Sequence, residues 1–210
     1  MLNSCESSLK PGQHCFSLLP MTALLDLPEV RERVHTLSVE DYHRLGELGI
    51  VSKDAELLQG IVVTKMSKSP LHELVVQKLL RLLLAKVPNE FEVRREGPLT
   101  LRDSEPEPDI SVVRGKPDDW LTAHPHSAHL VVEVAVTSAT VDEVKARIYA
   151  EAGIAEYWIV RAETGLVDVY RDPSRGEYHS KMTLRASEIL QCASLPSVKL
   201  VIAEILPARQ

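Results

Sequence analysis

Apolar residues recur every three or four positions in two stretches of the chain, and this spacing predicts amphipathic helices. The first stretch follows Ser38, whose side chain can cap a helix, and it stops at Gly49. The second opens at Ser69-Pro70, where Ser69 can cap and Pro70 loses no intrahelical hydrogen bond. We expect the second helix to pack on a large apolar surface through Leu71, Leu74, Val75, Leu79, Leu82 and Leu83.

Short apolar runs between turn residues predict strands. Residues 55–58 and 61–63 flank Gln59-Gly60, a pair typical of a tight hairpin. Further strands are expected at 91–95 with 98–102, then at 109–113 and at 129–136. The run from Leu130 to Val136 is apolar on both faces, so we expect a central strand that is covered on both sides.

The last part of the chain alternates between helix and strand signals. Residues 140–143 (Thr-Val-Asp-Glu) fit a capping box for a helix that runs through Ala152 and that Gly153 ends. A strand follows at 155–160, and a hairpin joins 166–170 to 178–184 through the turn residues 172–176. This order predicts an α/β fold with a central mixed β-sheet flanked by helices.

The chain has 210 residues, of which 44% are hydrophobic and 26% are charged, so we expect one globular domain with an extension. Residues 1–35 lack a sustained period and predict a flexible N-terminal arm, with at most one short helix that contains Leu24–Val30 and ends near His35; residues 36–210 form the expected domain. No apolar run approaches the ~18 residues that a membrane span needs. We therefore expect neither a membrane protein nor, from the N-terminal pattern, a secretory signal.

Acidic residues outnumber basic ones by 30 to 24, which gives a net charge of −6. This balance argues against a protein that coats nucleic acid by bulk attraction, although an enzyme with a small local basic patch remains compatible with it. Cys5, Cys15 and Cys192 are too few and too unevenly placed for a disulfide framework. Reduced thiols in a cytoplasmic protein fit them better.

Two carboxylates stand at positions where burial is expected. Asp109 follows Pro108 at the start of a strand, and Glu133 is the one charge inside the apolar central strand. A buried carboxylate costs several kcal/mol, roughly, unless a cation or hydrogen bonds compensate it. A Mg²⁺ ion between the two carboxylates would do so, and so would pairing with an arginine or an exit to solvent at the strand end. Lys145, on the next helix, either points back to this strand end or is a solvated surface lysine.

Several segments together resemble a bacterial family of restriction-endonuclease-like proteins in the PD-(D/E)XK nuclease superfamily. They span about residues 36–205 and occur in the order that the family shows. The segments are residues 56–60, His72, 104–110, 131–134, Lys145, 149–154 and 156–160.

The resemblance implies a restriction-endonuclease-like fold and metal-dependent hydrolysis of DNA. By this resemblance Asp109 and Glu133 are metal ligands for Mg²⁺ or Mn²⁺, Lys145 is the catalytic lysine, and Glu56 and His72 support the site. The superfamily commonly carries its lysine two residues after the acid, where this chain has Ala135. Two further departures are Val141, where the family often has an aspartate, and Arg161, where it commonly has an acid.

Other interpretations of these residues stay open at the level of sequence. His72 can be a satisfied, half-buried side chain, and Glu56 can pair with Lys65 across the hairpin. His124, His126 and His129 resemble a zinc tract on a loop, and Cys5 with Cys15 and His14 lacks a fourth ligand.

The function has alternatives as well. A catalytically impaired module that binds nucleic acid or a protein would keep the same fold, and a nuclease can act on RNA or on single-stranded or branched DNA. A homodimer would suit cleavage of both strands, and the apolar stretch 198–206 is either its interface or ordinary core.

Overall fold

The computed structural model describes residues 27–137 and 139–207, and the chain divides into two compact units, Met1–His35 and Thr36–Gln210. Among the described residues of the first unit, helix α2 (Pro28–Arg31) follows the N-cap Leu27 and contains Val30 of the expected helix. It ends at Arg31, before the expected end near His35. Leu24, Leu25, Cys5 and Cys15 lie outside the described residues.

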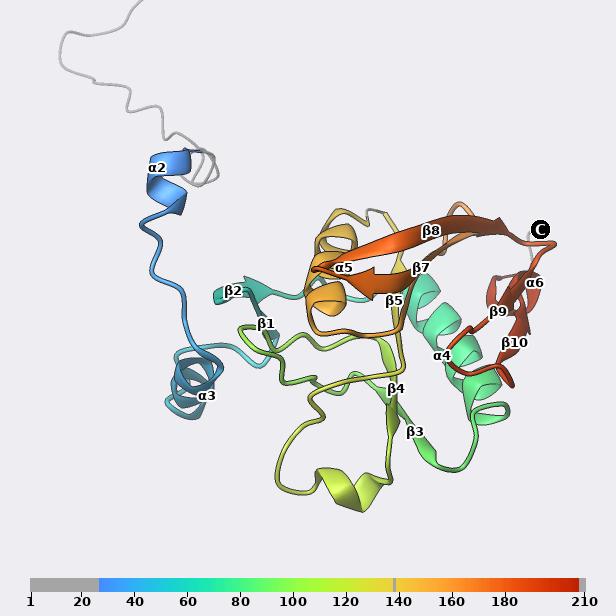
Figure 1. The fold of residues 1–210 in the computed structure, drawn as a ribbon, viewed down its shortest axis with the longest axis horizontal. Coiled ribbons are helices and arrows are strands. Elements are labelled where there is room, and N and C mark those ends of the chain that lie inside the picture. The colour runs from blue at the N-terminus through green and yellow to red at the C-terminus, as the bar shows by residue number, and fades with distance from the viewer. Residues whose placement is uncertain (1–26, 138, 208–210) are drawn as a thin grey trace, which may run out of the picture. The chain divides into compact units, whose positions relative to one another are not determined.

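The second unit is built on a six-stranded mixed sheet, as the sequence predicts. Its order is β3-β4-β5-β6-β7-β8, and β5 and β6 pair in parallel while the other neighbours are antiparallel (Figure 1). The bounds are β3 Phe91–Arg95, β4 Ile110–Arg114, β5 Leu130–Ala135, β6 Glu156–Arg161, β7 Leu166–Ser174 and β8 Glu177–Arg185. Every residue of β5 is buried, which confirms that the apolar run forms a covered central strand.

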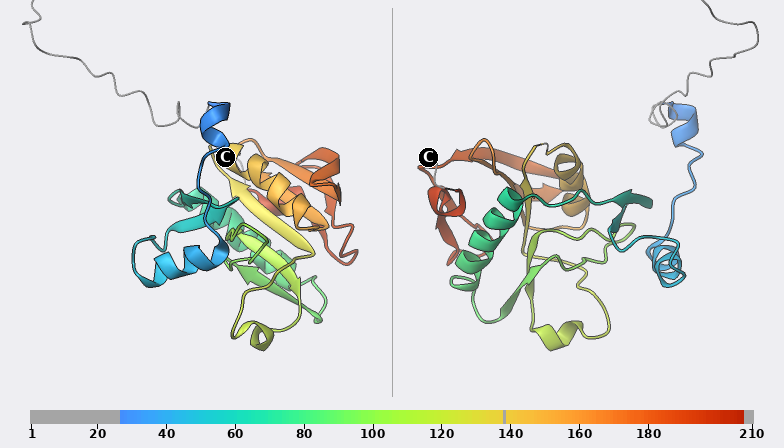
Figure 2. Two further views of the ribbon diagram at one scale, coloured as in Figure 1. Left: turned by 60° about the vertical axis from the view of Figure 1, so that its left-hand side comes forward. Right: turned by 180° about the vertical axis from the view of Figure 1, so that it is seen from behind.

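Helices cover both faces of this sheet (Figures 1 and 2). One face packs against α4 (Pro70–Leu84) and the C-terminal segment, which contains β9 (Ile189–Gln191), β10 (Lys199–Val201) and α6 (Ile202–Ile205). The other face packs against α5 (Thr140–Glu151). Val198, Leu200, Ile202 and Ile205 are fully buried, so the apolar stretch near the C-terminus is ordinary core.

The elements at the start of the second unit follow the expected pattern. Helix α3 (Val39–Glu47) begins after Ser38, which forms a capping box with Asp41. Strands β1 (Ala55–Leu58) and β2 (Ile61–Thr64) form the expected hairpin, in which Gln59 and Gly60 both have positive φ. Ser69 caps α4, and its side chain accepts a hydrogen bond from the backbone N–H of His72. The 3₁₀ helix η1 spans Pro117–Trp120.

Two local predictions are wrong. Residues 98–102 form no strand, because Pro98 lacks a donor and the N–H groups of Leu99 and Thr100 are bonded to the loop carbonyls of Pro106 and Pro125. Strand β3 therefore pairs with β4. Thr140 is also not an N-cap: α5 starts one residue earlier than the capping box requires, with Ala139 as an N-cap that has no side-chain bond.

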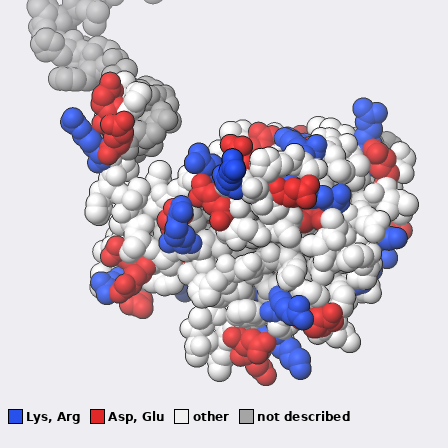
Figure 3. All heavy atoms as spheres, in the orientation of Figure 1, with Lys and Arg blue, Asp and Glu red and all other residues white. Residues whose placement is uncertain are grey.

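The β7–β8 hairpin is tighter than the sequence predicts, since its strands run to Ser174 and from Glu177 and leave only Arg175 and Gly176 in the turn. On the face seen in Figure 3, acidic and basic side chains are interspersed, and neither charge forms a broad field there. Among the described residues, no helix combines the length and the apolar content that a membrane span requires.

The turn at Gly60 gives a test of the packing around β1 and β2. A Cβ at Gly60 would lie 2.4 Å from the Cβ of Thr36, and the φ of this residue is +76°. We expect Gly60→Ala to lower the free energy of unfolding by about 1–3 kcal/mol, because the left-handed backbone and the clash both oppose a side chain. Chemical denaturation with urea measures this change.

Gly46→Ala is the matched control. Gly46 lies in α3, and no atom lies within 4 Å of the added Cβ. Alanine favours the helix over glycine, so this variant should gain up to about 1 kcal/mol. Equal effects of the two substitutions would contradict the packing described for Gly60.

Candidate active site

Glu133 lies in the middle of β5, on the face of the sheet that α5 covers, and its side chain is 6% exposed. Both of its carboxylate oxygens are hydrogen-bonded. Oε1 accepts from Lys145 Nζ at 2.9 Å and from Tyr149 Oη at 3.1 Å. Oε2 accepts from the backbone N–H of Asp109 at 3.2 Å. The charge that interrupts the apolar strand is therefore compensated inside the protein.

Asp109 lies beside Glu133 because of the register between β4 and β5. Ile110 pairs with Val132, so the residue before β4 lies opposite the residue after Val132. The Oδ2 atom of Asp109 accepts from the backbone N–H of Val134 at 2.8 Å and lies 3.0 Å from Nε2 of His72. Each carboxylate is thus held by a backbone amide of the neighbouring strand.

Lys145 joins a third carboxylate to this group. Its buried ammonium lies 2.9 Å from Oε1 of Glu56 as well as 2.9 Å from Oε1 of Glu133. Glu56 comes from β1, and its Oε2 accepts from the backbone N–H of Glu107 at 3.1 Å. The alternative pairing of Glu56 with Lys65 is not found, because Lys65 pairs with Glu107 instead.

A continuous set of contacts therefore links all five residues that the sequence singled out. It runs from Glu56 through Lys145 and Glu133 to Asp109 and His72. We call these five residues the carboxylate cluster. His72 is buried, and its Nδ1 has no hydrogen-bond partner.

Burial and mutual repulsion set the protonation of the cluster. Complete burial raises the pKa of Glu133 to about 8. The neighbouring carboxylates raise this pKa further, and the charge of Lys145 lowers it by less than these effects raise it. Burial also raises the pKa of Asp142 to about 6. The pKa of Lys145 is raised: burial lowers it, but the charges of Glu133 and Glu56 outweigh that effect.

Asp109 behaves differently. Burial raises its pKa, but the hydrogen bond and charge of His72 and the amide of Val134 together keep the pKa below its usual value. The repulsion of the neighbouring carboxylates adds to the effect of burial in raising the pKa of Glu133, so a further cation beside Glu133 would lower that pKa.

This donor set fits a hard divalent cation. Carboxylate oxygens are the ligands that Mg²⁺ prefers, and one or two of them suffice when water and substrate phosphate complete the coordination. Asp109 and Glu133 supply such oxygens. A group of three or more His, Cys, Asp or Glu side chains arranged for metal binding is not found in the described part of the chain, so a purely protein-made cage does not fit.

Some neighbours of the cluster escaped sequence reasoning. Tyr149 donates to Glu133, and its position on the same helical face as Lys145 was the available signal. Lys68 lies 3.6 Å from Oδ1 of Asp109, but its place in a loop gave no periodic signal. Asp142 is close enough to influence the pKa of Glu133, whereas Val141, at the position of the family's aspartate, is exposed.

Arg161, the other departure, has a structural role. Its guanidinium donates to Asp168 at 2.8 Å and to Glu143 at 2.6 Å, which ties β6 to β7 and to α5. The histidine tract brings no metal site together within the described residues. His126 Nδ1 lies 2.9 Å from the carbonyl oxygen of Thr100, and the ring of His129 packs edge-on against Phe91.

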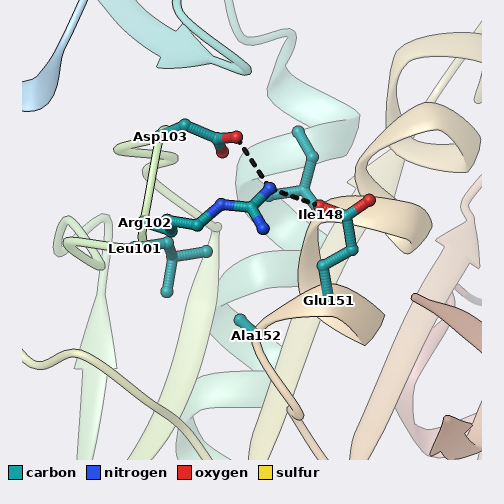
Figure 4. A pocket seen from close by; sticks show the side chains of 6 residues that line it. All are labelled: Leu101, Arg102, Asp103, Ile148, Glu151 and Ala152. Carbon is teal, nitrogen blue, oxygen red and sulfur yellow. Dashed lines mark hydrogen bonds and ion pairs between the residues drawn. The ribbon is translucent and has the colours of Figure 1, made fainter. Parts of the chain in front are cut away.

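A small surface hollow lies apart from the cluster (Figure 4). Arg102 crosses it and donates to Asp103 at 3.0 Å and to Glu151 at 3.1 Å. Leu101, Ile148 and Ala152 complete its lining. Its charged groups are paired with one another, so it is not a candidate catalytic site.

Comparisons with known proteins identify the family and the fold of this chain. Residues 39–203 match the model of the Uma2 family, described as "putative restriction endonuclease". The fold is similar to the crystal structure of "a putative nuclease belonging to DUF820" from Anabaena variabilis ATCC 29413, with a TM-score of 0.67 and 16% sequence identity over 80% of this chain and 97% of that one. No curated protein matches the chain.

The structural likeness is at low identity and therefore carries the fold alone, which is restriction-endonuclease-like, as the motifs imply. The family match covers most of the chain and confirms the resemblance read from its motifs. This chain belongs to the Uma2 family of restriction-endonuclease-like proteins.

Proposed function

We propose that this chain is a metal-dependent endonuclease that hydrolyses DNA phosphodiester bonds. The observation that carries the proposal is the buried pair Asp109 and Glu133, bonded through backbone amides, with Lys145 2.9 Å from Glu133. The family match supports a nuclease-like function, and restriction endonucleases act on DNA.

Cleavage of both strands suits two copies of such a site, so a homodimer is part of the proposal. A cytoplasmic location is part of it too, and the buried free thiol of Cys192 agrees with a reducing compartment.

Asp109 and Glu133 are the residues that would hold Mg²⁺ or Mn²⁺. When bound, such an ion polarises the scissile phosphate, lowers the pKa of a water and stabilises the charge that develops on the phosphate. The protein prepares this by fixing both carboxylates with backbone amides, which leaves little conformational entropy to lose on binding.

Lys145 acts in this proposal as a cation and a hydrogen-bond donor. Its pKa is raised above the usual value, so the ammonium keeps its proton at neutral pH and is unsuited to be a general base. An ammonium group has three N–H donors, and Glu56 and Glu133 accept two of them. The third can orient the attacking water beside the carboxylates.

Glu56 and His72 are positioning residues in the same proposal. Glu56 holds the ammonium of Lys145 together with Glu133, each at 2.9 Å. His72 contacts Oδ2 of Asp109, which fixes the orientation of that carboxylate.

A second candidate is a module with this fold that binds nucleic acid or a protein without turnover. It is favoured by the absence, among the described residues, of a three-residue metal cluster. Lys145 is also engaged by two glutamates. A panel of duplex, single-stranded and branched DNA and of RNA, each with and without Mg²⁺ or Mn²⁺, separates the two candidates and identifies the substrate class.

Cleavage of labelled substrates tests the assignment of residues. We expect wild-type protein to cut DNA only with a divalent metal, and Asp109→Asn and Glu133→Gln each to lose about 10²–10³-fold or more in rate, because each removes a charged ligand. Lys145→Met should lose a similar factor, and Lys145→Arg should recover part of it. Initial rates on a supercoiled plasmid measure these effects.

Glu177→Gln is the control for the acidic variants, since Glu177 is exposed on β8 and belongs to no part of the cluster. It should cut at the wild-type rate. Metal-independent cleavage, or full activity of Glu133→Gln, would contradict the proposed mechanism.

The protonation of the cluster predicts how stability changes with pH. Because the folded protein raises the pKa of Glu133 to about 8 and that of Asp142 to about 6, it binds more protons than the unfolded chain between about pH 5 and pH 8. Stability in a chelator should therefore fall as pH rises through this window. Added Mg²⁺ should reduce the fall by binding the deprotonated carboxylates.

Thermal denaturation at several pH values, with and without metal, measures this dependence. The variant Glu133→Gln separates the contribution of the cluster to this pH dependence from that of the histidines of the chain. Its melting temperature should depend less on pH than that of the wild type. A wild-type melting temperature that stays constant or rises from pH 5 to pH 8 in a chelator would refute the charge balance described for Glu133.

A further inference from the structure

Three basic side chains contact the carboxylates of Glu56, Asp109 and Glu133, and Lys68 is the most exposed of the three. Lys145 and His72 are buried, with 4% and 8% exposure. The third is Lys68, in the loop between β2 and α4, whose side chain is 32% exposed and whose Nζ lies 3.6 Å from Oδ1 of Asp109. Lys68 is therefore in contact both with the cluster, through Asp109, and with the solvent.

The two oxygens of Asp109 have different surroundings. Oδ2 accepts the amide of Val134 and contacts His72. Oδ1 has Lys68 as its charged neighbour, at a distance that is longer than a hydrogen bond. The ammonium of Lys68 is thus attracted to Asp109 without being fixed to it.

Glu96 holds Lys68 in this place. Its Oε2 lies 3.1 Å from the ammonium of Lys68, and its Oε1 accepts from Arg95 at 2.8 Å. The backbone N–H of Glu96 donates to the carbonyl of Asp109 at 3.2 Å, and Glu96 has a φ of +50°, which a non-glycine residue adopts at a cost. A strained residue bonded to the backbone of Asp109 therefore presents a carboxylate to Lys68.

We propose that Lys68 is a substrate-binding residue of this site: its ammonium exchanges Glu96 for a non-bridging oxygen of a backbone phosphate that lies next to the carboxylate cluster. This rests on the proposed function, because it deepens the nuclease site and names the residue that receives the anionic substrate. A phosphodiester that approaches Asp109, Glu133 and Glu56 meets like charges, and an ammonium at the rim offsets that repulsion. A compact, flexible ammonium suits a single phosphate oxygen.

The other lysines near the cluster suit this role less. Lys145 is enclosed between two glutamates. Lys65 is 24% exposed and pairs with Glu107 at 2.5 Å, and it contacts no carboxylate of the cluster. Lys68 alone among these lysines combines exposure, contact with Asp109 and a partner, Glu96, from outside the cluster.

Binding of DNA, measured separately from cleavage, tests the proposal. The probe is a fluorescein-labelled 20-base-pair duplex with Ca²⁺, titrated with full-length protein between 50 and 200 mM salt and followed by anisotropy. For Lys68→Ala we expect about a 10-fold higher Kd at the low salt end and a slope of log K against log salt that is smaller by about 0.9, the value of one phosphate contact. Lys199→Ala removes the same charge from an exposed position on β10 and should change neither quantity.

Glu96→Gln gives a change of opposite sign. It weakens the hold on Lys68, so the duplex should bind more tightly than to wild type. Because the gain acts through Lys68, it should vanish in the double variant Lys68→Ala/Glu96→Gln, whose Kd should equal that of Lys68→Ala. A gain that persists in the double variant would show that Glu96 acts through Arg95 or through general charge, and it would overturn the exchange.

The outcomes separate the two proposals. If wild type binds or cuts DNA while Lys68→Ala and Lys68→Gln match Lys199→Ala in Kd and salt slope, the role of Lys68 is refuted and the nuclease function stands. A third outcome is that Lys68→Ala binds DNA more weakly and melts at a lower temperature, while its salt slope stays unchanged. Lys68 is then structural, and the proposal fails. If wild type neither binds nor cuts any DNA with any metal, both proposals fail.

Discussion

Strand β5 carries the carboxylate of Glu133 between fully buried aliphatic neighbours, and the surrounding structure compensates for it. A carboxylate in such a place costs several kcal/mol, roughly, unless charge and hydrogen bonds replace water. Lys145, Tyr149 and the amide of Asp109 supply that replacement. Each of these partners belongs to a helix or strand whose position is set by its own packing and hydrogen bonds. The cost of burying Glu133 is therefore met by the fold as a whole.

The topology explains how the partners arrive. The parallel pair β5–β6 requires a crossover, and α5 is that crossover, which carries Lys145 and Tyr149 over the face where Glu133 lies. The antiparallel register of β4 and β5 sets Asp109 opposite Glu133. The hairpin β1–β2 adds Glu56 from outside the main sheet. Three separate pieces of chain thus converge on one strand position.

The excess of negative charge connects stability to function. Burial and the neighbouring carboxylates raise the pKa of Glu133, and a bound divalent ion would relieve that repulsion. The same excess would repel a phosphodiester. In the proposed site, the exposed ammonium of Lys68 offsets that repulsion. The carboxylates that destabilise the folded protein by their mutual repulsion are the same carboxylates that would hold the metal in the proposed reaction.

Much of this arrangement can be predicted from sequence, because local signals agree with the fold. The cap at Ser38, the Gln59-Gly60 turn and the apolar run of β5 each depend on neighbours in sequence, and each is confirmed. Residues 98–102 are not a strand because their amides find tertiary partners, which no local pattern reveals. Helix α5 starts at Thr140 with Ala139 as its N-cap, although Thr-Val-Asp-Glu fits a capping box one residue later.

The candidate site divides in a similar way. Asp109, Glu133 and Lys145 were singled out by an unexpected charge in a strand and by resemblance to a family. Their proximity is one of the alternatives that the residues themselves leave open, and the resemblance favours it; their roles stay proposals. Lys68 cannot be recognised from sequence, because a lysine in a loop has no pattern that distinguishes it from other surface lysines. Only the fold places it beside Asp109.

Direct localisation of a metal tests the central claim most sharply. Crystals of the full chain soaked in Mn²⁺ would give anomalous difference density at the manganese position. We expect a peak bound by the carboxylates of both Asp109 and Glu133, and we expect it to be lost in Glu133→Gln. Density elsewhere, or none at the cluster while the protein still cuts DNA, would contradict it.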